Sequence, residues 1–343
     1  MKQYLFTLFL LCSLGVSLLA QDKIKVISSA SMFTDMAQNI MTDDFEITTI
    51  VPIGGDPHKY NARPSDATRV SKADIVIVNG LTFEGWITEL IENAGTKAKI
   101  VTLTDGVTPI SSLDYANSSD PHAWMDAENA LIYIKNILDV CIEYKPDAKA
   151  ELTANYDKYK AELIALDQEI KDKISTIPAE RRILITSHDA FQYYGSKYGV
   201  RLEAIMGIST EAEAQTSDIT RVSKVLKESN VPSVFVESTI NPKMLKQIAM
   251  DNKVGIGGEL FADSLDDPEK PAGTYVGMLR YNTNTIVDGL TNGPKEEIKE
   301  EKQKDAPKED LLDPENMPLG LKIMLGVAML GVVLMVLIKR RKA

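Results

Sequence analysis

Through residues 23–103 of this chain, short apolar runs alternate with segments of helical periodicity, and this alternation limits the possible folds more than any other feature. Strands separated by helices pair in parallel and carry helices on both faces of their sheet. The expected strands are 23–29, 46–53, 74–80 and 99–103, and the expected helices are 31–41, 64–73 and 81–95. The sequence therefore predicts an α/β fold.

The second half of the chain repeats this alternation. Its expected strands are 182–187, 201–207, 232–238 and 253–261, and its expected helices are 218–230, 241–251 and 274–290. Between the halves, apolar residues recur at every third or fourth position from Leu152 to Ile174, which indicates one long helix rather than the strict heptads of a coiled coil. We predict two lobes, residues 21–145 and 179–294, each with a mostly parallel sheet flanked by helices, joined by a backbone helix at 146–178.

The amino-terminal segment, residues 1–20, has one Lys before a long apolar run and ends at Ala20, as a secretory signal peptide does. An uncleaved membrane anchor is the alternative. Cys12 lies inside the apolar run, and the residues before it, Phe9 to Leu11, lack the small side chains of a lipid-attachment motif. We therefore interpret Cys12 as part of the apolar run of the signal.

The carboxyl-terminal segment predicts a membrane anchor. Residues 318–338 are apolar over a length that spans a bilayer as a single helix. The basic tail at 339–343 is expected to stay in the cytoplasm. Residues 295–317 are charged and interrupted by prolines, which is typical of a solvated linker. We expect residues 21–294 to be exported and tethered to the outer face of the cytoplasmic membrane, in the periplasm or on the cell surface.

Composition excludes several classes of function. The formal charge of −11 argues against nucleic-acid binding, since phosphate contacts need clustered Lys and Arg. The two cysteines, Cys12 and Cys141, cannot form a thiolate zinc site, and we expect Cys141 to be a buried thiol in a helix. The sequence also contains no phosphate-binding glycine loop, nucleophile elbow or metalloprotease helix motif.

The chain has only three histidines. His58 and His122 each follow Asp-Pro in an expected loop, and His188 follows the expected strand 182–187, at the sheet edge where ligands gather. Each histidine also has an aspartate within two residues that could orient a metal-bound imidazole through its second nitrogen: Asp56, Asp120 and Asp189. A single loop histidine is more often an ordinary surface residue, so both a metal site and surface positions remain open.

A metal site would need a fourth ligand. Glu237 and Asp263 each lie at the end of an expected strand, near the edge where His188 is expected. Either carboxylate could equally be a solvated acid at the edge of a sheet. The residue pattern alone does not choose between them.

Five segments together resemble one protein family: GGDPHKYNARPSD, SDPHAWMDAENA, TSHDAFQYYGSKYGV, VFVEST and LFADSL. Their order and separation are similar to those of the zinc- and manganese-binding solute receptors of ABC importers, the cluster A-I family. The resemblance covers roughly residues 24–291. It implies two α/β lobes joined by one backbone helix, with the metal in the cleft between the lobes.

The resemblance also implies a ligand set. His58, His122 and His188 match the first three ligand positions, and Asp263 matches the fourth, which leaves Glu237 as a residue near the lobe interface. Three imidazoles with one carboxylate slightly favour Zn²⁺ over Mn²⁺ as the transported ion. An ABC permease and its ATPase would be the partners of a monomeric receptor.

We therefore expect a solute-binding protein, not an enzyme, that captures a divalent metal ion outside the cytoplasm and delivers it to a permease. A metal-dependent hydrolase is the first alternative, but it needs an open coordination position and a general base. A surface adhesin, a label attached to some members of this family, is the second. No host-binding patch is evident in the sequence.

Overall fold

The computed structural model of the protein describes residues 22–111 and 118–295. The predicted signal peptide, the linker from residue 296, the transmembrane helix and the basic tail all lie outside these residues. Within the described ranges, no helix is both long and apolar enough to cross a membrane. All described residues belong to one compact unit, Met1–Ile298.

The first half contains a four-stranded sheet in which every pairing is parallel. The strand order is β2-β1-β3-β4, and the central strand β3 is buried at all four positions, as its apolar sequence IVIV requires. The strands are β1 (Ile24–Ser28), β2 (Phe45–Thr49), β3 (Ile75–Val78) and β4 (Lys99–Thr102), and the helices between them are α2 (Ser31–Gln38), α3 (Pro64–Val70) and α4 (Ile87–Ala94). The predicted α/β fold is confirmed.

Helix α4 starts later than the sequence predicts. The helical pattern begins at residue 81, but Gly80, Leu81 and Thr82 all have positive φ angles, of 90°, 51° and 65°. A β-branched residue in this region is strained, so other contacts must hold the turn. The buried carboxylate of Glu84 accepts hydrogen bonds from the Asn79 amide (2.7 Å) and the Ser29 hydroxyl (2.5 Å). These bonds to β-strand ends fix a turn where periodicity alone predicts a helix.

The second half contains two parallel strand pairs, β5-β6 and β7-β8, and β5 of one pair contacts β7 of the other. Helices lie between and after the strands. The strands are β5 (Ile183–Thr186), β6 (Arg201–Ala204), β7 (Ser233–Glu237) and β8 (Gly255–Leu260), and the helices are α7 (Gln192–Tyr198), α8 (Thr216–Glu228), α9 (Lys243–Asp251) and α10 (Tyr275–Thr291).

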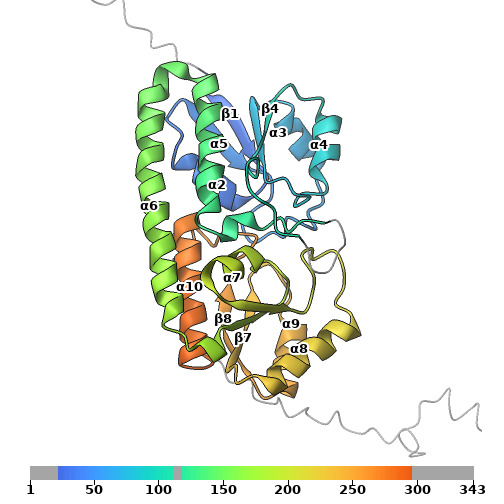
Figure 1. Ribbon diagram of the computed structural model, residues 1–343. Helices are drawn as coiled ribbons and strands as arrows, with labels where there is room; N and C mark the ends of the chain where they lie inside the picture. Colours follow the sequence, from blue (N-terminus) through green and yellow to red (C-terminus); the bar gives the residue numbers. More distant parts are fainter. Residues whose placement is uncertain (1–21, 112–117, 296–343) are drawn as a thin grey trace, which may run out of the picture. The chain divides into compact units, whose positions relative to one another are not determined.

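Helix α6 (Lys149–Ser175) runs along both halves (Figure 1). It packs against α5 (Asn129–Tyr144) of the first half and α10 of the second. Its buried side chains repeat at three- and four-residue steps: Leu152, Tyr159, Leu163, Leu166, Ile170 and Ile174. They belong to one hydrophobic core that continues from β1 in the first half to α10 in the second. Cys141 of α5 is buried in this core, as expected.

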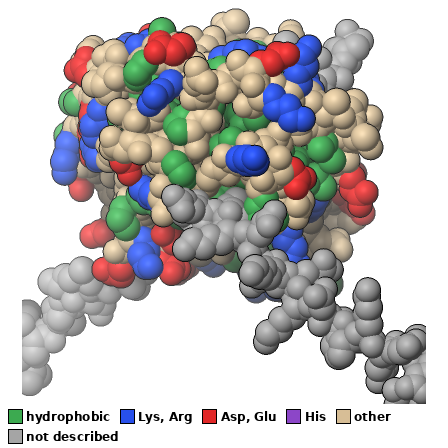
Figure 2. Space-filling view, turned by 90° about the horizontal axis from the view of Figure 1, so that it is seen from below, with side chains coloured by type: hydrophobic (Ala, Val, Ile, Leu, Met, Phe, Trp, Pro, Cys, Tyr) green, Lys and Arg blue, Asp and Glu red, His purple; other side chains and the backbone are tan. Residues whose placement is uncertain are grey.

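The surface carries charges of both signs. On the face seen in Figure 2, basic and acidic side chains are interspersed with hydrophobic ones rather than collected into one basic patch.

Asp35 of α2 links the two halves, because its Oδ2 accepts the Tyr275 amide at the start of α10 (2.9 Å). Burial raises the pKa of Asp35 to about 6. The folded protein therefore holds this proton more tightly than the unfolded chain does. The stability contributed by the bound proton is present below about pH 4 and is lost as the pH rises through about 6.

We predict that Asp35→Asn raises the free energy of unfolding at pH 7.5, by at most about 3 kcal/mol, because the amide keeps an acceptor for Tyr275 without a buried charge. At pH 4 the two proteins should differ much less. Urea denaturation of both proteins at both pH values measures this. Equal stabilisation at the two pH values would contradict the titration as its cause.

Candidate metal centre

Three histidines and one aspartate meet between the two halves of the chain. His58 and His122 come from loops of the first half, while His188 follows β5 and Asp263 follows β8 of the second. One ligand atom from each of the four lies within 4.8 Å of all the others, and all four residues are buried. The sequence-predicted positions are thus brought together.

The distances between these atoms fit a single small cation. The Nε2 atoms of His58 and His122 are 3.2 Å apart, and Nε2 of His188 lies 3.2 Å from Oδ2 of Asp263. The Asp263 carboxylate also lies 3.5 Å from His122 Nε2 and 3.7 Å from His58 Nε2. A tetrahedral ion with bonds of about 2.0–2.1 Å keeps its ligand atoms about 3.3 Å apart.

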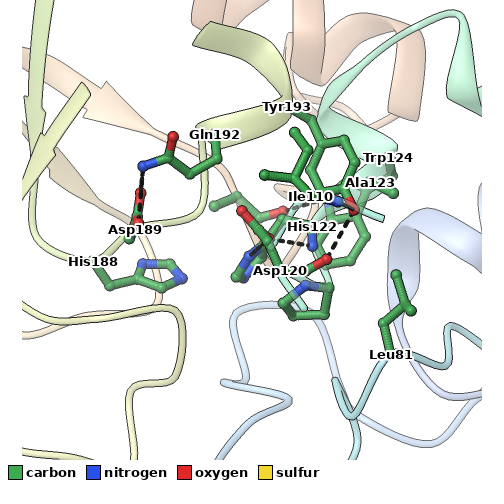
Figure 3. A network of polar contacts seen from close by, with 12 residues as sticks. Leu81, Ile110, Asp120, His122, Ala123, Trp124, His188, Asp189, Gln192 and Tyr193 are labelled. Carbon is green, nitrogen blue, oxygen red and sulfur yellow. Dashed lines mark hydrogen bonds and ion pairs between the residues drawn. The ribbon is translucent and has the colours of Figure 1, made fainter. Parts of the chain in front are cut away.

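The two histidines of the first half are oriented differently by their neighbouring aspartates. The Asp120 carboxylate contacts both the ring Nδ1 and the main-chain amide of His122, each at 2.8 Å (Figure 3). This contact leaves Nε2 of His122 directed to the shared point. Asp56 instead contacts His58 through its main-chain amide, at 2.9 Å, and its other oxygen accepts the Thr210 hydroxyl. Asp56 therefore shapes the loop without orienting the imidazole ring.

The third histidine is oriented by Glu237 and not by its sequence neighbour. Glu237 Oε2 lies 2.6 Å from Nδ1 of His188, and its Oε1 accepts the amides of Ser187 and His188 at 2.9 and 2.8 Å. Asp189 bonds to the side chain of Gln192, as Figure 3 shows. The expectation that Asp189 orients the ring was therefore wrong, because the chain turns after β5 and directs that carboxylate toward α7.

Asp263 is held by main-chain contacts on both sides. The Trp124 indole donates to the carbonyl of Ala262 (3.0 Å), and the Gly54 amide donates to the Ser264 hydroxyl (2.7 Å). Asn282 of α10 bonds to both main-chain groups of Phe261. Within the described residues, neither carboxylate oxygen of Asp263 accepts a hydrogen bond of good geometry. A buried carboxylate without such donors lacks a partner, and a bound cation would supply one.

Protonation in the centre also suits a cation. Burial lowers the pKa of His58 to about 3, so its ring is neutral and its lone pair available. Burial opposes ionisation of Asp263, but the imidazoles outweigh it and hold the pKa of Asp263 below its usual range. Burial also opposes the charging of His188, yet Glu237 and Asp263 raise its pKa well above the ordinary value. Without a cation, a proton on His188 balances the buried acids.

Several supporting residues were not found from the sequence. Asn79, after β3, donates from its side chain to the Pro121 carbonyl (2.9 Å) and so fixes the residue before His122. Phe83 sets its ring edge-to-face with His58 at 4.9 Å between centroids. The position of Asn79 at the end of a strand is the only local sign that it belongs to the site. Its contact with Pro121 could not be predicted, because the two residues lie 42 positions apart in the sequence.

Comparison with known proteins gives one consistent result. The family model for the periplasmic component A of the zinc-uptake complex matches residues 26–289. The metal ABC transporter substrate-binding lipoprotein SsaB of Streptococcus sanguinis is 35% identical over 277 residues, which cover 78% of this chain and 90% of that protein. The manganese-binding lipoprotein MntA of Halalkalibacterium halodurans is also 35% identical, over 79% of this chain and 89% of its own.

Solved structures show the same likeness. The periplasmic zinc-binding protein TroA from Treponema pallidum superposes with a TM-score of 0.75 at 30% identity, covering 78% of this chain and 99% of its own. A manganese-bound periplasmic metal-binding protein from Candidatus Liberibacter asiaticus gives a TM-score of 0.72 at 30% identity, with 78% and 100% covered. Each of these solved chains is matched over almost its whole length by 78% of this chain.

The ring-orienting acids give a test with an internal control. We predict that Asp120→Asn and Glu237→Gln each weaken zinc affinity about 10–100-fold, because each removes a carboxylate that orients an imidazole. Asp189→Asn should leave the affinity unchanged, since Asp189 contacts Gln192 instead. Competition with a zinc-sensitive dye measures all three variants. Equal losses in the three would show that the contacts with Nδ1 do not matter.

Proposed function

Because the chain belongs to the zinc-uptake component A family of periplasmic metal receptors, we propose that it captures Zn²⁺ or Mn²⁺ outside the cytoplasm and delivers the ion to an ABC permease and its ATPase. The convergence of His58, His122, His188 and Asp263 is the observation that carries the proposal. Members of this family are receptors rather than enzymes.

The four converging residues are the proposed metal ligands. Three imidazole nitrogens and one carboxylate oxygen at near-tetrahedral spacing favour zinc slightly. Manganese would be accommodated if both oxygens of Asp263 bound it, and neither oxygen is otherwise engaged within the described residues. The four protein ligands leave no position for a reactive water, which supports a receptor over a hydrolase.

Release of the ion would require the two halves to separate, since each half supplies two ligands. Among the contacts between the halves near the site are Thr210 to Asp56 (2.6 Å) and Gly54 to Ser264 (2.7 Å). Helix α6 packs on both halves and would limit how far they move. We propose lobes at 21–145 and 179–294, a monomeric receptor and a small opening motion about α6.

The ends of the chain complete the proposal. A signal peptide at 1–20 would export the receptor, and a helix at 318–338 would anchor it with the tail 339–343 in the cytoplasm. Relatives such as SsaB are named lipoproteins. Here the residues before Cys12 lack the small side chains of a lipid-attachment motif, so the carboxyl-terminal helix is the proposed anchor. A flexible linker would hold the receptor near its permease.

We expect residues 21–298 to bind one Zn²⁺ or Mn²⁺ per chain, measured by calorimetry and elemental analysis. His188→Ala and Asp263→Ala should each weaken metal binding more than roughly 100-fold, which is the upper limit expected for loss of a carboxylate that only orients an imidazole. Asp267→Asn, an exposed acid on the same segment, serves as the matched control. Unchanged affinity in both ligand variants would refute the assignment.

The anchor is tested separately by fractionating cells. A chain ending at residue 298 should leave the membrane fraction, because it lacks the apolar segment. Cys12→Ser should remain with the membrane, since no lipid on Cys12 is needed. Release of the Cys12→Ser protein would indicate a lipid anchor instead, and retention of the shortened chain would indicate an anchor at the amino-terminal end, either a lipid or an uncleaved signal.

A further inference from the structure

A cavity of about 550 Å³ lies beside the metal centre, and none of the four proposed ligands lines it. Its wall includes Asp56, two residues before His58, and Ser187, one residue before His188. The volume is within the range of about 300–1,000 Å³ typical of small-molecule sites. It far exceeds what a single metal ion needs, so metal binding alone does not account for it.

One wall of this cavity is apolar. Ile205, Met206 and Leu245 line it from the β6 end and from α9. Ile205 and Leu245 are themselves almost fully buried, so they form a fixed surface. A wall of this kind packs against hydrocarbon and offers nothing to a hydrated ion.

Two lysines, Lys59 and Lys243, also line the cavity. Among the described residues, neither side chain forms an ion pair or hydrogen bond. Both side chains are exposed and free to pair with an anion bound at the cavity. The one acid in the lining, Asp56, is already engaged, since its oxygens accept the His58 amide (2.9 Å) and the Thr210 hydroxyl (2.6 Å). The cavity therefore offers positive charge.

Two hydroxyl groups of the lining are buried without a partner. Ser187 is only 4% exposed, and its Oγ makes no hydrogen bond within the described part of the chain. The same holds for Oγ1 of Thr239. Buried hydroxyls are normally satisfied. Both oxygens are covered by neighbouring atoms, but since Ser187 and Thr239 line the cavity, rotation about χ1 would present either hydroxyl to a ligand there.

We propose that this cavity binds a small organic carboxylate with an apolar body, next to the metal ion. The carboxylate pairs with Lys59 and Lys243, and the Ser187 hydroxyl donates to it after rotation about χ1. The apolar body packs on Ile205, Met206 and Leu245. This site stands apart from the metal ligands and does not depend on which ion they hold.

Benzoate and benzamide form the matched pair of probes, because they share a ring and differ in charge. Metal-free residues 21–298 are titrated with each probe by saturation-transfer NMR. Benzoate should bind in the millimolar range and benzamide at least tenfold more weakly. Equal binding of the two, or no binding of benzoate, would overturn the proposal and leave the cavity as an entry route for the ion.

Variants locate the binding. Lys59→Gln combined with Lys243→Gln should weaken benzoate binding at least tenfold, while Lys158→Gln, an exposed lysine on α6, should not. Both cavity lysines are exposed, so the fold should survive, and thermal unfolding checks this. Wild-type benzoate affinity in the double variant would refute the site. Zinc titration of the same proteins tests the metal proposal separately, since His188→Ala should lose zinc and keep benzoate.

Discussion

The buried charge of Asp263 is the constraint on which the rest of the structure depends. An ionised carboxylate without hydrogen-bond donors is costly in a protein interior, and here three imidazoles offset that cost. The imidazoles are themselves fixed by outer acids, Asp120 for His122 and Glu237 for His188. From the centre outward, the carboxylate of Asp263 is therefore followed by imidazole rings, and those of His122 and His188 are followed by a second layer of carboxylates. A divalent cation at the centre can replace the proton that balances this arrangement.

The frame around this centre is held by bonds that cross between the halves. The indole of Trp124 in the first half holds the Ala262 carbonyl, and the hydroxyl of Tyr275 in the second bonds to the Trp124 carbonyl (2.5 Å). The Tyr193 hydroxyl of α7 donates to the Asp120 carbonyl (3.0 Å). Main-chain groups on both sides of His122, and the carbonyl before Asp263, are thus fixed.

Much of this could be predicted from the sequence, for identifiable reasons. The strands and helices follow from periodicity, and the positions of His58, His122 and His188 follow from loop and strand-end placement. The choice of Asp263 over Glu237 came only from a family resemblance, because both acids end a strand. Asp189 was wrongly expected to orient His188, since adjacency in sequence does not fix side-chain direction. The hydrogen bond from Trp124 to Ala262 joins residues 138 positions apart, so no local sequence pattern predicts it.

The hydrophobic core has a consequence for how the protein folds. One apolar cluster runs from β1 through α6 to α10, so the main core is shared by the two halves, while a smaller cluster lies within the first half alone. The two halves therefore constitute a single cooperative folding unit rather than two independent ones. A cation bound between them would shift the folding equilibrium of the whole unit by mass action, so the metal-loaded protein would open less often to a protease.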